Sequence, residues 1–246
     1  MERRTACSTD TQHVVNLSGY VWAARQLAPL EQRCVLDLSC GTGYGSDYLG
    51  TCAGRIVGID CAPAVVAKSR ADYPRSNVAF LAMDACALAF EDASFDCVVS
   101  QDTIEHVSDD RRFVSELTRV LKPHGVVIIF TPHGKGRGVT PTDPYHIREY
   151  TLEEFKVLLQ PHFSTIQWYG RRQGHRLKTV ERSMATIRNL DPAGFRQYVP
   201  RPIRHWLGSL MSRVQGGPAL REIVPDDIEY REGVADDTNL IGICVK

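Results

Sequence analysis

The stretch VLDLSCGTGYGS, from Val35 to Ser46, decides the fold of this 246-residue chain. A short apolar run containing Asp37 leads into a turn with a glycine at every second position. A continuous apolar run of this length is typical of a strand that is buried on both faces of a parallel sheet. A glycine-rich turn after such a strand is where a helix begins and a nucleotide binds. The stretch therefore predicts a strand–loop–helix unit with a ligand at the carboxyl end of the strand.

Short apolar runs continue to alternate with helical segments outward from this unit. Apolar residues at helical spacing between Val14 and Leu27 predict a helix before it. Strands are predicted at Cys34–Leu38, Arg55–Ile59, Val78–Leu81, Phe95–Ser100, Gly125–Thr131, Phe163–Tyr169 and, as an edge or hairpin partner, Asn239–Val245. Helices are predicted at Gly43–Leu49, Pro63–Asp72, Arg111–Leu121 and, behind the capping box Thr151–Glu154, as far as Leu159. This alternation predicts an α/β fold with a doubly wound, Rossmann-like sheet, mostly parallel with an antiparallel C-terminal strand.

We expect a single domain over residues 1–246, with a lid inserted between the last two strands. Its parts are an N-terminal helical segment (1–30), a ligand-binding core (31–170), a basic helical insertion or lid (171–237) and the last strand (238–246). A segment as long as the insertion needs structure of its own and has a role.

The insertion has an uneven charge. From Arg171 to Arg213 it has ten Lys or Arg residues and two acids, whereas Glu222–Asp237 is acidic. A basic lid would suit an anionic acceptor, or it would approach lipid headgroups. Residues 201–214 carry one apolar helical face, which is more typical of packing on the domain or on the second subunit of a homodimer than of a membrane.

The composition excludes several classes of partner and compartment. The formal net charge is zero, and aromatic residues are not interleaved with the basic ones, which argues against nucleic acid as a partner. No apolar run approaches the ~20 residues of a transmembrane helix, and the N-terminus lacks the apolar region of a signal peptide. The eight cysteines form no C-x-x-C pair, which favours free thiols in a reducing cytoplasm over a zinc site or disulfides.

The spacing of the glycines indicates which nucleotide the loop binds. They follow the pattern G-x-G-x-G rather than the G-x-G-x-x-G of dinucleotide sites. Asp37 would repel a pyrophosphate but would accept hydrogen bonds from an ammonium group. Asp60 ends the second strand, at the distance where ribose hydroxyls are bound, and Asp84 follows the third, placed for an adenine amine. These positions predict a ligand with an adenosine half, a charged amino-acid half and no phosphate.

From about His13 to Phe163 the chain resembles the class I S-adenosylmethionine (SAM)-dependent methyltransferases. The motifs that carry the resemblance are VLDLSCGTGYG (35–45), IVGID (56–60), AMDA (82–85), FDCVVSQDTIEHV (95–107) and RVLKPHGVVIIFTP (119–132). The resemblance implies SAM as cofactor, S-adenosylhomocysteine as its product, and a site after the first four strands. The cofactor-binding residues that it implies are Tyr20, Asp37, Ser39, Gly41, Thr42, Gly43, Asp60, Cys61, Asp84, Ala85 and Gln101.

Ser39 departs from that family's commonest pattern, which has glycine at this position. Two interpretations stay open. The hydroxyl binds the amino-acid end of the cofactor, or the serine is a neutral substitution at a tolerant position.

The candidate catalytic residues follow the fourth strand. In-line methyl transfer to an aliphatic hydroxyl requires a base or a metal as well as alignment. The sequence DTIEH offers Asp102, Glu105 and His106, expected on one face of a helical turn, and His146 precedes the capped helix. We expect His106 or His146 to be the general base, without a metal. As the alternative, these four residues would hold a divalent ion, similar to the site of small-RNA 2′-O-methyltransferases, or Glu105 and His106 would only tie the turn to a nearby loop.

The GYVWAAR (19–25) and PYHIREYTLEEF (144–155) segments resemble bacterial enzymes that methylate sugars, glycolipids or natural products. The resemblance implies a cytoplasmic O-methyltransferase of natural product biosynthesis, whose acceptor is a small molecule such as a sugar or glycoside. Two alternatives remain: a metal-assisted RNA 2′-O-methyltransferase, and a SAM-binding protein without catalysis that serves a partner enzyme.

Overall fold

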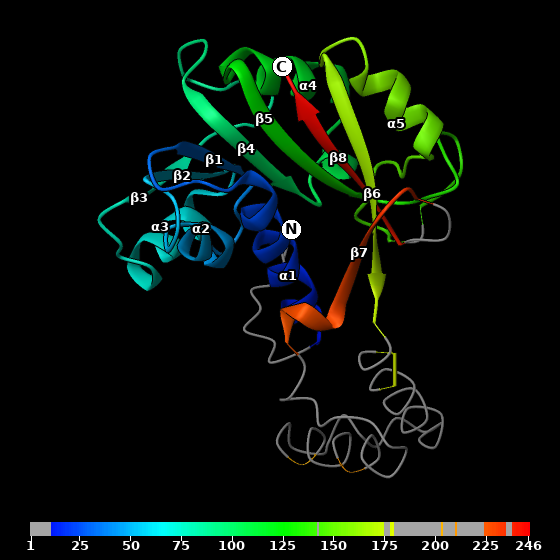
Figure 1. Ribbon diagram of the computed structural model, residues 1–246, viewed down its shortest axis with the longest axis horizontal. Coiled ribbons are helices and arrows are strands. Elements are labelled where there is room, and N and C mark those ends of the chain that lie inside the picture. Colours follow the sequence, from blue (N-terminus) through cyan, green and yellow to red (C-terminus); the bar gives the residue numbers. More distant parts are fainter. Residues whose placement is uncertain are drawn as a thin grey trace. The chain divides into compact units, whose positions relative to one another are not determined.

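The computed structural model describes residues 11–141, 143–174, 178–179, 203, 210, 224–234 and 238–246 (Figure 1). The chain divides into two compact units, one of Gly19–Arg171 with Tyr230–Lys246 and one of Met1–Ser18 with Arg172–Glu229. The first of these units holds every residue that the sequence predicts for the cofactor and for catalysis.

The described elements follow the α/β order that the sequence predicts. They are α1 (Thr11–Leu27), β1 (Cys34–Leu38), α2 (Tyr44–Leu49), β2 (Arg55–Asp60), α3 (Pro63–Asp72), β3 (Val78–Ala82), β4 (Phe95–Gln101), the 3₁₀ turn η1 (Ile104–His106), α4 (Asp110–Val120), β5 (Leu121–Pro132), α5 (Leu152–Leu159), β6 (Thr165–Gln173), η4 (Pro225–Asp227), β7 (Ile228–Glu232) and β8 (Asn239–Val245). The short, polar strand β7 (IEYRE) was not predicted, because its residues lack a clear apolar run.

The strands form one sheet in the order β3-β2-β1-β4-β5-β8-β6-β7 (Figure 1). Strands β1 to β5 pair in parallel, and β1 lies between β2 and β4. Strand order reverses at β1 and β4, which is the topological switch point where open α/β sheets bind their ligands. The predicted mostly parallel, Rossmann-like sheet with an antiparallel C-terminal strand is confirmed.

Strand β8 lies inside the sheet rather than at its edge. It pairs antiparallel with β5 on one side and with β6 on the other, so that Gly242 faces both Ile129 and Trp168. The expectation of an edge or hairpin strand was therefore wrong. The NLIGICV run is apolar throughout, as an interior strand requires.

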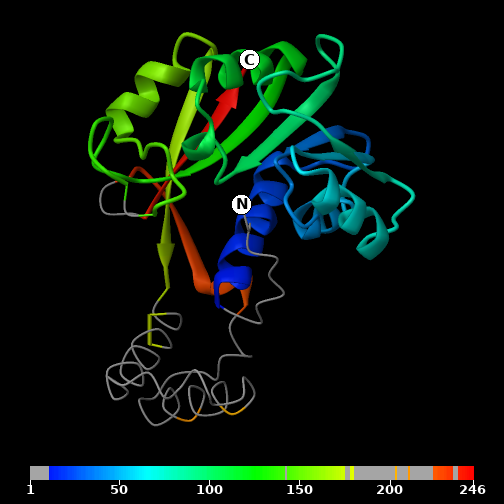
Figure 2. The ribbon, with the colours of Figure 1, turned by 180° about the vertical axis from the view of Figure 1, so that it is seen from behind.

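Two hydrophobic clusters cover the two faces of the sheet. Because successive strand residues point to opposite faces, Leu36 and Val35 belong to different clusters. Phe113 of α4 packs in the cluster of Leu36, and Trp22 of α1 packs in the cluster of Val35. Figures 1 and 2 show α1 against one face and α4 with α5 against the other.

The predicted helix boundaries hold to within a residue or two. Helix α4 begins after Asp109, whose side chain accepts a hydrogen bond from the backbone N–H of Arg112. It ends at Val120, and β5 begins at once, so the LKPHG segment belongs to a strand longer than predicted. The capping box of α5 is confirmed, since the side chains of Thr151 and Glu154 each bond the other residue's backbone N–H.

Most of the basic insertion lies outside the described residues, as does the predicted apolar face of residues 201–214 except for Ile203 and Leu210. These two side chains are exposed. The lid, its basic surface, the anionic acceptor and the homodimer stay predictions. Among the described residues, no helix is both long and apolar enough to cross a membrane.

Candidate cofactor and catalytic site

The loop after β1 has a left-handed backbone at alternate residues, with φ of 63° at Ser39, 54° at Gly41 and 85° at Gly43. It is tied to the sheet because Cys40 N–H donates to the carbonyl of Ile59 at 2.7 Å. Glycine adopts positive φ without the steric cost that a Cβ brings. A glycine at the Ser39 position, as is common in the resembled family, would adopt this positive φ without steric cost. The serine of this chain adopts the same φ with the steric cost of its Cβ.

Asp37 lies beneath this loop and is fully buried. Ser46 Oγ donates to one of its carboxylate oxygens at 2.6 Å, and Tyr20 OH donates to the other at 3.1 Å. Burial raises the pKa of Asp37 to about 6, against the lowering effect of these two hydrogen bonds. Asp37 therefore positions Tyr20 and the start of α2 rather than facing the solvent.

Gly45 makes the contact between Tyr20 and α2 possible. A Cβ at this glycine would lie 2.2 Å from the Tyr20 ring. The third glycine of the motif therefore serves the packing of α1 against α2. The glycine spacing in the sequence also reflects this packing, and not the cofactor alone.

Asp60 ends β2 and holds the loop from the other side. Its carboxylate accepts from the N–H of Gly41 at 3.2 Å and from that of Ala62 at 2.9 Å. The carboxylate thus lies between the glycine loop and the residues that follow β2, at the strand end where the sequence predicts contact with ribose hydroxyls. Its own carbonyl accepts from Met83 N–H at 3.0 Å, which brings the end of β3 alongside.

Asp84 is exposed next to this point. One of its carboxylate oxygens accepts from Cys86 N–H at 2.8 Å. Its neighbour Ala85 is half-buried, and Cys61, which follows Asp60, is exposed. These residues lie after β2 and β3, at the edge of the sheet where the predicted cofactor would bind.

Gln101 ends β4 directly under helix α1. A Cβ at Gly19 of that helix would lie 1.9 Å from Gln101 Oε1, so a larger residue there would require the Gln101 side chain to move. The structure thus brings the ends of β1 to β4 together around the loop that contains Gly41, Thr42 and Gly43. Every predicted cofactor residue lies at this edge or, like Tyr20, packs beneath the loop.

Glu105, His106 and His146 form a cluster just beyond Gln101. One ligand atom of each, a carboxylate oxygen or a ring nitrogen, lies within 4.8 Å of the other two. The centroids of the two imidazole rings lie 5.0 Å apart, and the ring planes make an angle of 70°. Glu105 is fully buried, His146 is partly buried and His106 is exposed, so the cluster opens to the solvent on one side.

Both histidines are anchored through the same ring nitrogen. His106 Nδ1 lies 2.9 Å from the carbonyl oxygen of Tyr145, and His146 Nδ1 lies 2.8 Å from Glu149 Oε1. A carbonyl or carboxylate partner assigns the proton to Nδ1 and leaves the Nε2 lone pair available. Neither Tyr145 nor Glu149 was predicted as part of the site.

Glu105 joins the cluster to the sheet. Its Oε2 accepts from Thr131 Oγ1 at 3.1 Å, while its buried Oε1 has no hydrogen-bond partner among the described residues. Its backbone carbonyl accepts from the N–H of Ile147 at 2.8 Å, which ties η1 to the loop that carries His146. Glu105 therefore connects the turn η1 to the neighbouring loop, which is one of the two roles that the sequence analysis left open. Its side chain still has one carboxylate oxygen without a partner among the described residues. Burial, and then the charge of Asp102, raises the pKa of Glu105 well above its usual range.

Asp102 does not share a helical face with Glu105 and His106. It has a left-handed φ of 49° and precedes the 3₁₀ turn, so the helical spacing does not apply. Its carboxylate accepts from Asn239 Nδ2 at 3.1 Å and lies 3.6 Å from the buried guanidinium of Arg171. Sequence reasoning missed both partners, which face each other across β6 and β8.

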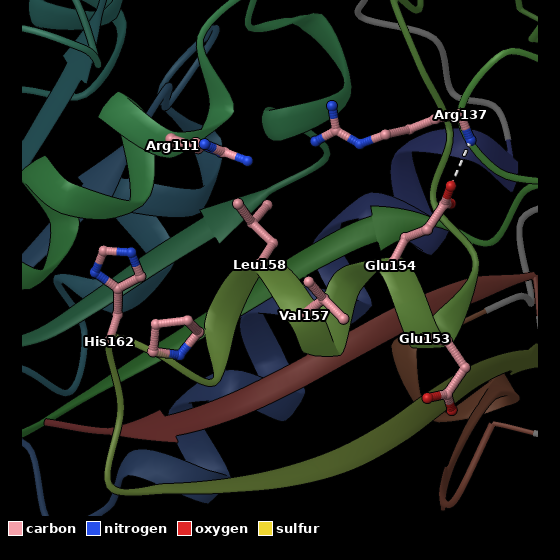
Figure 3. A pocket seen from close by; sticks show the side chains of 8 residues that line it. Arg111, Arg137, Glu153, Glu154, Val157, Leu158 and His162 are labelled. Carbon is pink, nitrogen blue, oxygen red and sulfur yellow. Dashed lines mark hydrogen bonds between the residues drawn. The ribbon is translucent and has the colours of Figure 1, made fainter.

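A separate cavity of about 690 Å³ lies along α5. Figure 3 shows Val157 and Leu158 of α5 lining it, with Arg111 and His162 nearby. Arg137 and Glu154 also line it, and the N–H of Arg137 donates to Glu154 Oε1 at 2.8 Å. None of the residues predicted for the cofactor or for catalysis lines this cavity.

The sheet order, the switch point and the glycine loop after β1 define a Rossmann-like domain. Comparison with known proteins specifies it further. Residues 36–129 match the family model of the methyltransferase domain. A protein of Mycolicibacterium smegmatis named "Probable S-adenosylmethionine-dependent methyltransferase" is 41% identical over 139 residues, which cover 53% of this chain and 53% of that protein.

A second relative and a solved structure of similar fold have names that differ in the acceptor atom. The ubiquinone biosynthesis O-methyltransferase of Azorhizobium caulinodans is 36% identical over 110 residues, or 44% of each chain. The solved structure is that of Haemonchus contortus phospholethanolamine N-methyltransferase 2, in complex with phosphomonomethylethanolamine and S-adenosylhomocysteine. The superposition covers 92% of this chain and 52% of that chain, with a TM-score of 0.60 and 21% sequence identity. The matched segments span about half the length of the two curated relatives. The chain contains a class I SAM-dependent methyltransferase domain, and SAM is the cofactor of that class.

Proposed function

We propose that this chain transfers a methyl group from SAM to a hydroxyl of a small-molecule acceptor such as a sugar, a glycoside or another natural product. The observation that carries the proposal is the cluster of Glu105, His106 and His146 directly beyond the β4 end of the cofactor edge. A hydroxyl needs help to lose its proton, whereas an amine acceptor needs less. Two anchored imidazoles with available lone pairs supply that help.

The cofactor would lie along the carboxyl ends of β1 to β4. Asp60 would accept from the ribose hydroxyls and Asp84 from the adenine amine. The loop from Ser39 to Gly43 would wrap the methionine part, with Gln101 near the sulfonium. Since Asp37 is buried under Tyr20 and Ser46, its proposed part is to position Tyr20 and the loop.

Proton removal would fall to an imidazole Nε2, with His146 the better placed of the two. Its Nδ1 bonds the Glu149 carboxylate, which orients the ring and stabilises the charge that the imidazole gains. His106 has only a neutral carbonyl partner. Catalysis also requires that the acceptor oxygen, the methyl carbon and the sulfur lie in one line. This alignment would supply a large part of the rate enhancement.

The matched relatives support transfer to oxygen through one named O-methyltransferase, which acts in ubiquinone biosynthesis. We extend only the reaction type to this chain. The acceptor is not carried over, because the region where acceptor specificity would lie is the insertion after Arg171, and the matched 36–129 segment does not include it.

The test is methyl transfer from radiolabelled SAM to a panel of glycosides, phenols and quinols, analysed by mass spectrometry for the methylated atom. His146→Ala should lower turnover by about 10²–10⁴-fold, as expected for loss of a general base. The control, His124→Asn, changes a histidine at the start of β5, and asparagine tolerates its left-handed φ of 62°. SAM binding without turnover on any acceptor would instead favour the non-catalytic alternative.

A further inference from the structure

The cavity along α5 lies outside the residues assigned to the cofactor and to catalysis. Its volume of about 690 Å³ is within the range that is typical of small-molecule sites, roughly 300–1,000 Å³. Val157, Leu158 and Pro161 give it an apolar lining, and the side chain of Val157 is 73% exposed. Covering an exposed aliphatic side chain with an apolar group is favourable. The cavity therefore suits a ligand with an apolar body.

Two arginines line the same cavity. In Figure 3 the guanidinium groups of Arg111 and Arg137 point toward one another above Val157 and Leu158. The side chain of Arg111 is exposed and has no hydrogen bond or ion pair with a described residue. Of the guanidinium nitrogens of Arg137, only Nη2 has such a partner. Because guanidinium groups bind carboxylates and phosphates through paired N–H donors, the two arginines offer a place for an oxyanion between them.

The acids near these arginines compensate their charge only in part. Arg137 Nη2 donates to Asp110 Oδ2, but the same oxygen lies 3.1 Å from Arg148 Nη1. One negative charge therefore serves two guanidinium groups. Glu154 also lines the cavity, and its carboxylate already accepts from the backbone N–H groups of Arg137 and Thr151.

The other polar side chains of the lining agree with an anionic ligand. Glu153 pairs with Lys156 at 2.8 Å, and in Figure 3 its carboxylate points away from the two arginines. The ring of His162 has no hydrogen bond with a described residue. The lining side chains without a polar partner are thus Arg111 and His162, which suits an anion better than a cation.

We propose that this cavity binds a small organic anion, with its carboxylate or phosphate between Arg111 and Arg137 and its apolar body over Val157 and Leu158. The oxyanion would separate the two facing positive charges, and the apolar body would remove Val157 from water. Such a ligand would be distinct from the cofactor and from the methyl acceptor, since none of the residues proposed to bind those lines the cavity. Its binding does not depend on the proposed methyl transfer.

The test uses octanoate as the probe, titrated into the full chain without SAM. Calorimetry measures the affinity, and proton NMR follows the histidine ring signals, with that of His162 assigned through its loss in His162→Gln. We expect one octanoate per chain, a dissociation constant in the millimolar range or below, and a shift of the His162 signal. Acetate and octan-1-ol, which keep only the carboxylate or only the apolar body, should bind at least about tenfold more weakly. Octyl phosphate, compared with octanoate, shows which oxyanion the arginines prefer.

Two exposed positions test the geometry with little effect on folding. Arg111→Ala removes one charged donor, and Val157→Asp places a carboxylate in the apolar lining, so each should weaken octanoate binding at least about tenfold. Arg111→Lys keeps the charge and should lose less than Arg111→Ala. The control Arg55→Ala removes an exposed arginine at the start of β2, outside the cavity, and should bind octanoate as the wild type does. Melting curves of each variant verify that it is folded.

The proposal is overturned if neither octanoate nor octyl phosphate binds, or if octan-1-ol binds as tightly as octanoate. Wild-type affinity in folded Arg111→Ala and Val157→Asp variants would also contradict it. Saturating SAM should leave octanoate binding unchanged, and displacement of octanoate by SAM would locate the probe at the cofactor edge instead and overturn the proposal. These results leave the proposed methyl transfer untouched, because that function is tested by turnover and by His146→Ala.

Discussion

The buried carboxylate of Asp37 should make the stability of the SAM-free protein depend on pH in an unusual direction. Its pKa is raised from 3.8 to about 6 because the side chain is fully buried. The folded state therefore keeps this proton up to about pH 6, whereas the unfolded chain releases it near pH 4. The stabilisation is fully present below the unfolded pKa and is lost as pH rises through the folded pKa.

The magnitude follows from the size of the shift. About two pKa units correspond to roughly 3 kcal/mol over the whole window, of which about 2 kcal/mol falls between pH 4.5 and 7.5. Asp37→Asn removes the titration but leaves an amide oxygen to accept from Ser46 or Tyr20. The free energy of unfolding of the wild type minus that of Asp37→Asn should therefore fall by about 2 kcal/mol from pH 4.5 to 7.5.

The assay is urea unfolding of both proteins at four pH values, with slopes checked for two-state behaviour. The control is Asp72→Asn, which changes an exposed carboxylate paired with Lys68 and should shift the difference by less than about 0.5 kcal/mol. A difference between the wild type and the Asp37→Asn variant that stays constant, or that rises with pH, would refute the account of this site.

Three further predictions concern the loop and its supports. Ser39→Gly should stabilise the protein by about 1 kcal/mol, or roughly 2–4 °C in melting temperature, because it removes a Cβ at positive φ, and Ser39→Ala should give no such gain. Gly45→Ala places a Cβ against the Tyr20 ring, so urea unfolding should show a loss of about 1–3 kcal/mol, and an unchanged stability would mean that α1 and α2 do not pack as described. Thr151→Ala should cost about 0.5–2 kcal/mol through the lost cap of α5, with Thr151→Ser as the control that keeps the oxygen; equal melting temperatures for the two variants would contradict the capping role.

The core of the sheet was predictable because its strands obey a simple rule. β1 and β4 are covered on both faces, and a strand in that position must be apolar at nearly every residue. The cap of α5 depends on hydrogen bonds within three residues, so the spacing of Thr151 and Glu154 predicted where this helix begins. Strand β7 carries no such signal, and its pairing depends on the sheet that it joins.

The sequence named the residues of the candidate site but did not indicate how they are arranged. The positive φ of Ser39 arises from the path of the loop between β1 and β2, and serine itself gives no sign of it. Asp102 departs from its expected helical face because it pairs with Arg171 and Asn239. Those two lie 68 residues apart in the chain and meet only through the register of β6 and β8. Contacts of this kind depend on tertiary structure, which residue spacing does not encode.

The most direct test of the central claim is a calorimetric titration of the full chain with SAM. We predict binding in the micromolar range, and at least a tenfold loss of affinity in Asp84→Ala, because the adenine amine would lose a charged acceptor worth about 1.5–3 kcal/mol. The control Asp72→Ala removes an exposed acid at the end of α3 and should leave the affinity unchanged. Failure of SAM to bind, or equal affinity in the wild type and a folded Asp84→Ala variant, would contradict a SAM site at the carboxyl edge of β1 to β4.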